Sequence, residues 1–214
     1  MKVEDTNVKL NLPNKLTVLR LILVPVFMVV MYFNALWADI LGLLLFIGAS
    51  VTDLLDGKIA RKHGLVTDFG KFLDPLADKF MVLGAMMMIL LKSFTRESTG
   101  LLFSVVFFFA VLIVIFRELA VTSMRLVVSG SSGIVIAANM LGKIKTCTQI
   151  TCVIACIVEP AFYGLLAPLE LSVITILSKY LPLSLLTTAV MAFFTLWSGI
   201  NYILAYWKYL DPEK

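Results

Sequence analysis

Four aspartates in the first half of the chain have the spacing of residues that share helix faces. Asp53 and Asp56 are three positions apart, and Asp74 and Asp78 are four apart, so each pair lies on one side of its own helix. If the two helices are antiparallel neighbours joined by a short loop, all four carboxylates meet. Carboxylates at close quarters repel one another unless cations lie among them, and oxygen ligands suit Mg²⁺ or Mn²⁺. We therefore expect these residues to hold two divalent ions, an arrangement suited to phosphoryl-transfer chemistry.

Small residues accompany these aspartates. Gly57 and Ala60 extend the face that carries Asp53, and Gly70 precedes Asp74 by one turn. They leave space between the two backbones. The alternative is a solvated, charged loop, but a scattered loop would not keep acids and small residues on the same faces.

A second group of charged residues lies further along the chain, at Arg117, Arg125, Lys143 and Lys145. Arg117 and Arg125 are eight positions apart, which returns to nearly the same helix face, and Glu118 is placed to orient one of the cations. Four cations beside a metal site need an anion, which a phosphate on the substrate would supply. For each of the four, the alternative is the general excess of basic residues at one membrane face.

Long apolar blocks make up most of the chain. The 214 residues are 60% hydrophobic and 15% charged, whereas a soluble domain has roughly 45–50% apolar and about 25% charged residues. Several blocks reach the roughly 20 residues that cross a bilayer. We predict one all-α domain over residues 1–214, a six-helix transmembrane bundle with an N-terminal juxtamembrane segment. The expected helices cover approximately residues 16–33, 40–63, 67–91, 101–128, 137–158 and 183–207.

Capping and turn residues set the expected ends of these helices. Thr67 is a candidate N-cap for the third helix, and residues 92–99 are expected to form a polar loop. The Ser and Gly residues of 129–133 should break the fourth helix, and the fifth should end before Pro160. Residues 160–182 are expected to form a longer connection along the membrane interface.

The basic residues predict an orientation. Fifteen of the 18 Lys and Arg residues lie at alternate helix ends, so the positive-inside rule places both termini and the aspartates at the cytoplasmic face of the cell membrane. The net charge of +4 fits a face that meets anionic lipid or substrate. With three cysteines and one histidine, a zinc site is not expected. No basic stripe with interleaved aromatic residues predicts binding to nucleic acid.

The aspartate segment resembles the signature of the CDP-alcohol phosphatidyltransferases, D-x-x-D-G-x-x-A-R-x₈-G-x-x-x-D-x-x-x-D. It matches at Asp53, Asp56, Gly57, Ala60, Arg61, Gly70, Asp74 and Asp78. The resemblance implies a membrane enzyme in which the four aspartates ligate two metal ions and Asp78 is also the base. It further implies that the CDP-linked lipid binds at Thr52, Gly57, Ala60 and Arg61.

Shorter strings are similar to the phosphatidylglycerophosphate synthases within that family. They are residues 11–20, 70–79, 117–118, 124–125, 142–145 and 197–199. This similarity implies CDP-diacylglycerol and sn-glycerol 3-phosphate as substrates, CMP as by-product, and a homodimer. Asn14, Thr17 and Arg20 would contact the nucleotide end, although helix capping explains Asn14 and Thr17 equally well.

Two other functions remain open from the sequence. The first is the same chemistry with another acceptor, such as inositol phosphate or phosphatidylglycerol. The second is a divalent-cation transporter, because acids inside membranes also mark ion paths. A transporter would place acids at mid-membrane, whereas these lie at one end of each helix.

Overall fold

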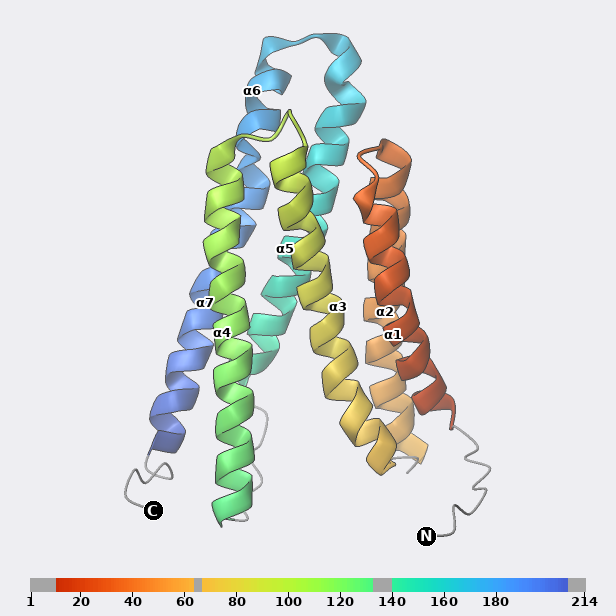
Figure 1. Cartoon of the computed structure of the whole chain (residues 1–214), viewed down its shortest axis with the longest axis vertical. Helices are drawn as coiled ribbons and strands as arrows, with labels where there is room; N and C mark the ends of the chain where they lie inside the picture. Colours follow the sequence, from red (N-terminus) through yellow and green to blue (C-terminus); the bar gives the residue numbers. More distant parts are fainter. Residues whose placement is uncertain (1–10, 64–66, 133–139, 208–214) are drawn as a thin grey trace.

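The structure, a computed structural model, describes residues 11–63, 67–132 and 140–207, with the side chains of all of these except Pro13, 54–63, Asp68, Lys71 and 129–132. Within these ranges the chain forms helices joined by short turns, with no strand. The elements are α1 (Leu12–Tyr32), α2 (Leu36–His63), α3 (Asp68–Thr95), α4 (Leu101–Ser132), α5 (Met140–Leu166), η1 (Ala167–Leu169), α6 (Ser172–Tyr180) and α7 (Pro182–Tyr206). Six of these helices, α1 to α5 and α7, are long. They run side by side (Figure 1), which confirms the expected all-α six-helix bundle.

Five stretches of the described residues are long and apolar enough to cross a membrane. They are Asn14–Tyr32, Leu36–Asp53, Leu101–Val128, Met140–Leu169 and Ser172–Tyr206. α3 is not among them, because Asp78, Lys79 and Lys92 flank its apolar stretch closely. Many large apolar side chains elsewhere are exposed on the outside of the bundle, as expected where lipid is the solvent.

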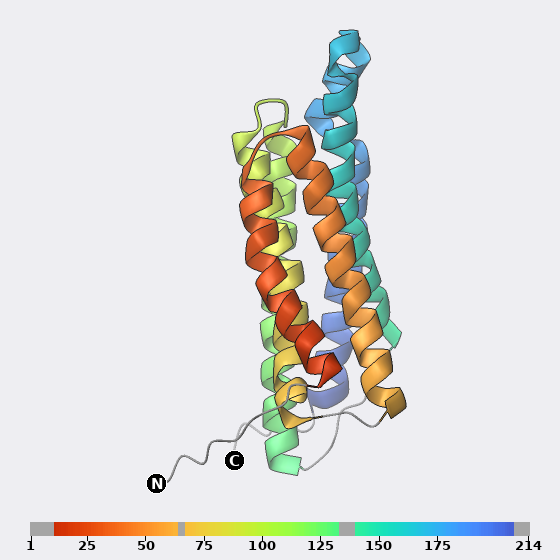
Figure 2. The same ribbon diagram turned by 90° about the vertical axis from the view of Figure 1, so that its right-hand side faces the viewer.

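The helices associate in two groups that meet in the core. α1 packs against α2 and α3, whereas α4 and α5 pack against α7; contacts of α3 with α4 and of α2 with α5 join the groups. Figure 2 shows α1 and α2 side by side at the front of the bundle. The shared core contains Phe46, Met86, Phe107, Cys152 and Met191.

Three expected helix ends were wrong, and tertiary contacts explain two of them. α3 continues to Thr95, so Lys92 lies inside a helix and not in a polar loop. α5 continues through Pro160, where Glu159 accepts hydrogen bonds from the backbone N–H groups of Leu183 (3.0 Å) and Ser184 (2.6 Å) at the start of α7. These bonds anchor the helix across a proline that removes one backbone donor. α4 also continues to Ser132, into the segment expected to break it, and the rest of that segment lies outside the described residues.

Residues 160–182 form helical segments where an interfacial connection was expected. The end of α5, η1 and α6 fold back at one end of the bundle (Figure 1). Leu181, which has a left-handed backbone (φ 47°), ends α6 and is followed by Pro182 at the start of α7. Gly100, in the turn between α3 and α4, donates its N–H to the Lys179 carbonyl oxygen at 2.8 Å, so α6 is tied to that turn.

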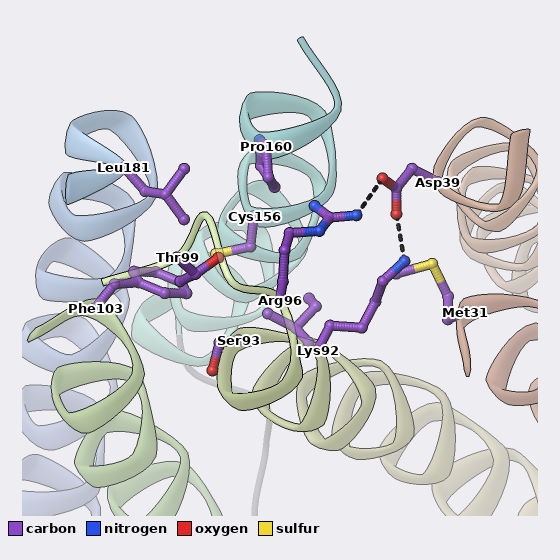
Figure 3. Close-up of a pocket in the computed structure, with 11 residues that line it drawn as sticks. Met31, Asp39, Lys92, Ser93, Arg96, Thr99, Phe103, Cys156, Pro160 and Leu181 are labelled. Carbon is purple, nitrogen blue, oxygen red and sulfur yellow. Dashed lines mark hydrogen bonds and ion pairs between the residues drawn. The ribbon is translucent and has the colours of Figure 1, made fainter. Parts of the chain in front are cut away.

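An ionic cluster closes the same end of the bundle, which we call the far end (Figure 3). Asp39 of α2, only 3% exposed, accepts hydrogen bonds from Lys92 and from Arg96, the latter at 2.7 Å. Lys92 also donates to the carbonyl oxygen of Phe33 at 3.1 Å. Three segments, the α1–α2 turn, the start of α2 and the end of α3, are thereby held together.

Candidate active site

The opposite end of the bundle, where α1 and α3 begin, carries the candidate active site. Thr67 caps α3 as expected, because its side-chain oxygen accepts from the Gly70 N–H at 3.0 Å. The Asn14 side-chain amide donates to the same Thr67 oxygen at 2.9 Å. A Cβ at Gly70 would lie only 2.8 Å from the Asn14 Oδ1, so a side chain at this position would displace the Asn14 amide. Asn14 is buried in these contacts, which join the starts of α1 and α3. Asn14 itself lies inside α1, whose N-cap is Asn11, so its contact is with the Thr67 side chain and is not a helix cap.

Two further residues of α1 hold predicted metal ligands. The Thr17 hydroxyl donates to Asp74 Oδ1 at 2.7 Å, and Arg20 forms an ion pair with Asp53. The Arg20 side chain is fully buried, while that of Asp53 is 35% exposed. Because α1 touches both α2 and α3 here, it orients one carboxylate on each. The expected contacts of Thr17 and Arg20 with the nucleotide stay a prediction.

Asp78 is one of three predicted metal ligands whose side chains the structure describes. It is half-buried, whereas Asp74 is exposed. Its carboxylate interacts electrostatically with Asp53 across the helix interface, with Arg20, and with Lys145 and Glu118 on the other side of the site. Asp78 therefore lies between Asp53 on one side and the second charged group, with Glu118 and Lys145, on the other.

The metal site is only partly described. Among the described side chains, no three acidic, histidine or cysteine residues gather closely enough to hold an ion. Asp56, Gly57, Ala60 and Arg61 lie in the last turns of α2, but their side chains are outside the described set. The described carboxylates come from two helices at one end of the bundle and offer only oxygen donors, which suits Mg²⁺ or Mn²⁺.

Thr52 makes a local contact. Its hydroxyl donates to the Ala49 carbonyl oxygen of its own helix at 2.8 Å. This back-bond occupies the hydroxyl proton, so only the oxygen lone pairs remain for a ligand.

Glu118 gathers two of the four predicted phosphate-binding cations. It accepts from Arg117 Nη1 at 3.2 Å and forms an ion pair with Lys145. Arg117 Nη2 also donates to the Ser198 hydroxyl at 2.7 Å. A Cβ at Gly199 would lie 3.0 Å from Arg117 Cγ, so the missing side chain admits the arginine. Helices α4, α5 and α7 thus converge on one pair of cations.

The other two predicted cations lie apart from this pair. Arg125 donates from Nε to the Tyr202 hydroxyl at 3.0 Å and lies over the Tyr202 ring, 5.5 Å from its centroid. Arg125 and Lys143 are both exposed. The expected group of four is therefore two buried cations and two peripheral ones.

Sequence reasoning missed two residues at the site. Lys79 donates to the Thr122 hydroxyl. Gln149 of α5 is 2% exposed and lines a small cavity together with Asp78, Glu118 and Lys145. The available signal for Gln149 was the one amide side chain of this helix, four positions after Lys145.

Comparison with known proteins identifies the family. Residues 10–207 match the sequence model of the CDP-alcohol phosphatidyltransferases. The chain belongs to this family. It is therefore a phosphatidyltransferase and, with its apolar helices, an integral membrane protein.

Named relatives come from bacteria and plants. The chain is 39% identical to CDP-diacylglycerol–glycerol-3-phosphate 3-phosphatidyltransferase of Bacillus subtilis, over 95% of this chain and 99% of the relative. It is 32% identical to the Arabidopsis thaliana protein CDP-diacylglycerol–glycerol-3-phosphate 3-phosphatidyltransferase 2, over 94% and 82% of the two chains. A rice cardiolipin synthase (CMP-forming) is 38% identical over 66% of this phosphatidyltransferase and 44% of the relative.

Proposed function

We propose that this enzyme transfers the phosphatidyl group of CDP-diacylglycerol to sn-glycerol 3-phosphate, giving phosphatidylglycerophosphate and CMP. The observation that carries the proposal is the Arg117–Glu118–Lys145 cluster beside Asp78. The names of the Bacillus subtilis and Arabidopsis thaliana relatives support the same substrates.

The charge of the cluster favours an acceptor that carries a phosphate. Arg117 and Lys145 bring two positive charges and Glu118 one negative charge, and their side chains are only 10–12% exposed. A buried excess of positive charge is costly unless an anion joins it. Arginine and lysine both bind phosphate oxygens through charge-assisted hydrogen bonds. An acceptor without a phosphate would leave that charge uncompensated.

Asp78 is the proposed base. It takes the proton from the primary hydroxyl of the acceptor, and the hydroxyl oxygen attacks the phosphorus that bears diacylglycerol. A new phosphorus–oxygen bond forms, the bond from that phosphorus to the bridging pyrophosphate oxygen breaks, and CMP leaves. Most of the catalysis is positioning and electrostatic stabilisation. Thr17 and Arg20 contribute by fixing the directions of Asp74 and Asp53.

Two divalent ions, Mg²⁺ or Mn²⁺, complete the proposal. Asp53, Asp56, Asp74 and Asp78 would hold them, and when bound they supply positive charge for the pyrophosphate and the departing CMP. Thr52, Gly57, Ala60 and Arg61 are proposed to accept the nucleotide. We place the site at the cytoplasmic face of the cell membrane, following the distribution of basic residues, and propose a homodimer.

An acceptor panel tests the function. The purified enzyme is given CDP-diacylglycerol with Mg²⁺ or Mn²⁺ and either sn-glycerol 3-phosphate, inositol phosphate or phosphatidylglycerol. We expect CMP and phosphatidylglycerophosphate with the first acceptor only, and no product when the metal is chelated.

Phosphatidylglycerol is the second candidate acceptor, favoured by the partial similarity to the rice cardiolipin synthase. CMP release with phosphatidylglycerol and not with sn-glycerol 3-phosphate would replace the proposed acceptor. Failure to release CMP with any acceptor would contradict the proposed reaction.

A further inference from the structure

Gln149 of α5 carries a buried side-chain amide. It is 2% exposed, and its side-chain nitrogen has no hydrogen-bond partner among the described residues. An unsatisfied buried donor destabilises the folded state, so such groups in folded proteins are retained where a ligand or water pairs with them. Of its neighbours, Lys145 pairs with Glu118 and Lys79 donates to the Thr122 hydroxyl.

The Gln149 side chain borders a small cavity within the site. Asp78 and Lys79 of α3, Glu118 of α4, and Lys145 and Gln149 of α5 line this cavity, and Val82 and Val114 form part of its apolar wall. Gln149 follows Lys145 by four positions, so the two share one face of α5. A molecule held by Lys145 and facing Asp78 therefore lies beside the unpartnered side-chain nitrogen of Gln149.

We propose that Gln149 binds the secondary hydroxyl of the acceptor and so selects a phosphorylated polyol. This inference rests on the proposed function. The acceptor sn-glycerol 3-phosphate has three polar groups: a phosphate, a reacting primary hydroxyl and a secondary hydroxyl. Arg117 and Lys145 suit the phosphate, and Asp78 suits the reacting primary hydroxyl. The secondary hydroxyl is left for Gln149.

The chemistry of an amide fits this assignment. A hydroxyl group both donates and accepts hydrogen bonds, and a glutamine side chain offers one group of each kind. The amide carries no charge, so it adds nothing to the phosphate site and does not compete with Asp78 for the metal ions. Because Gln149 is buried, water does not replace a missing substrate group. An acceptor that lacks the secondary hydroxyl leaves the amide unpaired, and a site rejects an analogue in this way.

A substrate analogue isolates the contact. 3-Hydroxypropyl phosphate has the phosphate and the primary hydroxyl but lacks the secondary hydroxyl. For the wild type we expect kcat/KM to be about 10- to 100-fold higher with sn-glycerol 3-phosphate than with this analogue. In Gln149→Met, which has a similar length and no amide, the ratio should fall close to one.

Thr195→Val is the matched control. Thr195 is also fully buried with an unpartnered oxygen, but it lies on α7 and does not line the cavity. Replacing Thr195 should leave the ratio of kcat/KM for the two acceptors at the wild-type value. Because Gln149→Met removes an unpaired polar group, its unfolding temperature without substrate should equal or exceed that of the wild type. Should it not yield folded protein, Gln149→Asn withdraws the amide by one methylene and should lower the ratio as well.

The outcomes separate the two proposals. If the wild type does not discriminate between the acceptors, or if Gln149→Met discriminates as well as the wild type, Gln149 does not bind the secondary hydroxyl. If Thr195→Val loses the discrimination too, the effect is not specific to Gln149 and the assignment fails. If the wild type releases no CMP with either acceptor, the proposed function itself is wrong.

Discussion

The surroundings of Asp78 differ from those of the other described carboxylates at the site. Asp53 is held by Arg20, and Asp74 by Thr17. Asp78 has no direct side-chain hydrogen bond among the described residues, yet it lies within electrostatic reach of charges from both halves of the site. A carboxylate that is enclosed but not tied to a neighbouring donor is suited to accept a proton from substrate.

Replacing that carboxylate tests its role. Asp78→Asn keeps the shape but removes the basic oxygen, so kcat for CMP release should fall by about 10²–10⁴-fold. Binding of CDP-diacylglycerol, measured by titration in detergent, should change little, because the other predicted ligands remain. Glu97→Gln, an exposed acid at the far end, is the control and should retain wild-type kcat. If Asp78→Asn turns over at the wild-type rate, Asp78 is not the base.

Among the helices, the packing of α1 on α3 determines the geometry of the site. Asn14, Thr17 and Arg20 lie about one turn apart on α1, and each contacts a residue of α2 or α3. Thr67 connects α1 to the start of α3, because its hydroxyl oxygen accepts hydrogen bonds from the Gly70 N–H and from the Asn14 amide. The position of Asp74 on α3 therefore depends on an N-cap seven residues earlier.

Removing the cap tests this dependence. Thr67→Val is close in shape but loses the oxygen, and loss of an N-cap costs about 0.5–2 kcal/mol. We expect a lower unfolding temperature of the purified protein in detergent and a reduced kcat/KM, as α3 shifts relative to α1. Thr67→Ser keeps the oxygen and should behave like the wild type. An unchanged unfolding temperature in Thr67→Val would show that the cap does not stabilise the α1–α3 contact.

Helix periodicity and capping chemistry predicted much of this arrangement. The spacings of Asp53 with Asp56 and of Asp74 with Asp78 predicted carboxylates on two facing helices. Asp53 and Asp78 do interact electrostatically, while the meeting of all four stays a prediction. Thr67 was correctly expected to cap α3. Predictions from the local sequence were wrong where a contact with a distant segment determines the structure. Lys92 was expected in a loop because it is charged, but Asp39, 53 positions away, makes its burial in a helix tolerable. Pro160 was expected to end α5, and a contact with α7 offsets its effect.

Side-chain partners within the site were the least predictable. Arg117 and Arg125 are equivalent by helix spacing, yet Arg117 turns inward to Glu118 and Ser198, while Arg125 packs on Tyr202. The choice depends on which residue of α7 faces each arginine, and Gly199 provides the space at one of them only. A single sequence does not specify how two helices far apart in the chain are aligned.

The whole molecule places different kinds of charged cluster at its two ends. At the site end, charges are partly exposed or border a cavity. At the far end, one buried carboxylate, Asp39, compensates two cations and ties three segments together (Figure 3). The first arrangement suits ligand exchange, and the second suits a structural contact, because a buried ion pair that loses one partner is strongly destabilised.

This division predicts that stability and catalysis can be changed separately. Asp39→Asn leaves Lys92 and Arg96 without their counter-charge, which should cost about 3–5 kcal/mol and lower the unfolding temperature in detergent by several degrees. Well below that temperature kcat should remain at the wild-type value, since the site end keeps all of its contacts. Glu170→Gln, which alters an exposed acid near the same end, should change neither quantity. A loss of kcat in folded Asp39→Asn, at a temperature where the variant stays intact, would instead mean that the far-end cluster is coupled to the position of Asp78 along α3.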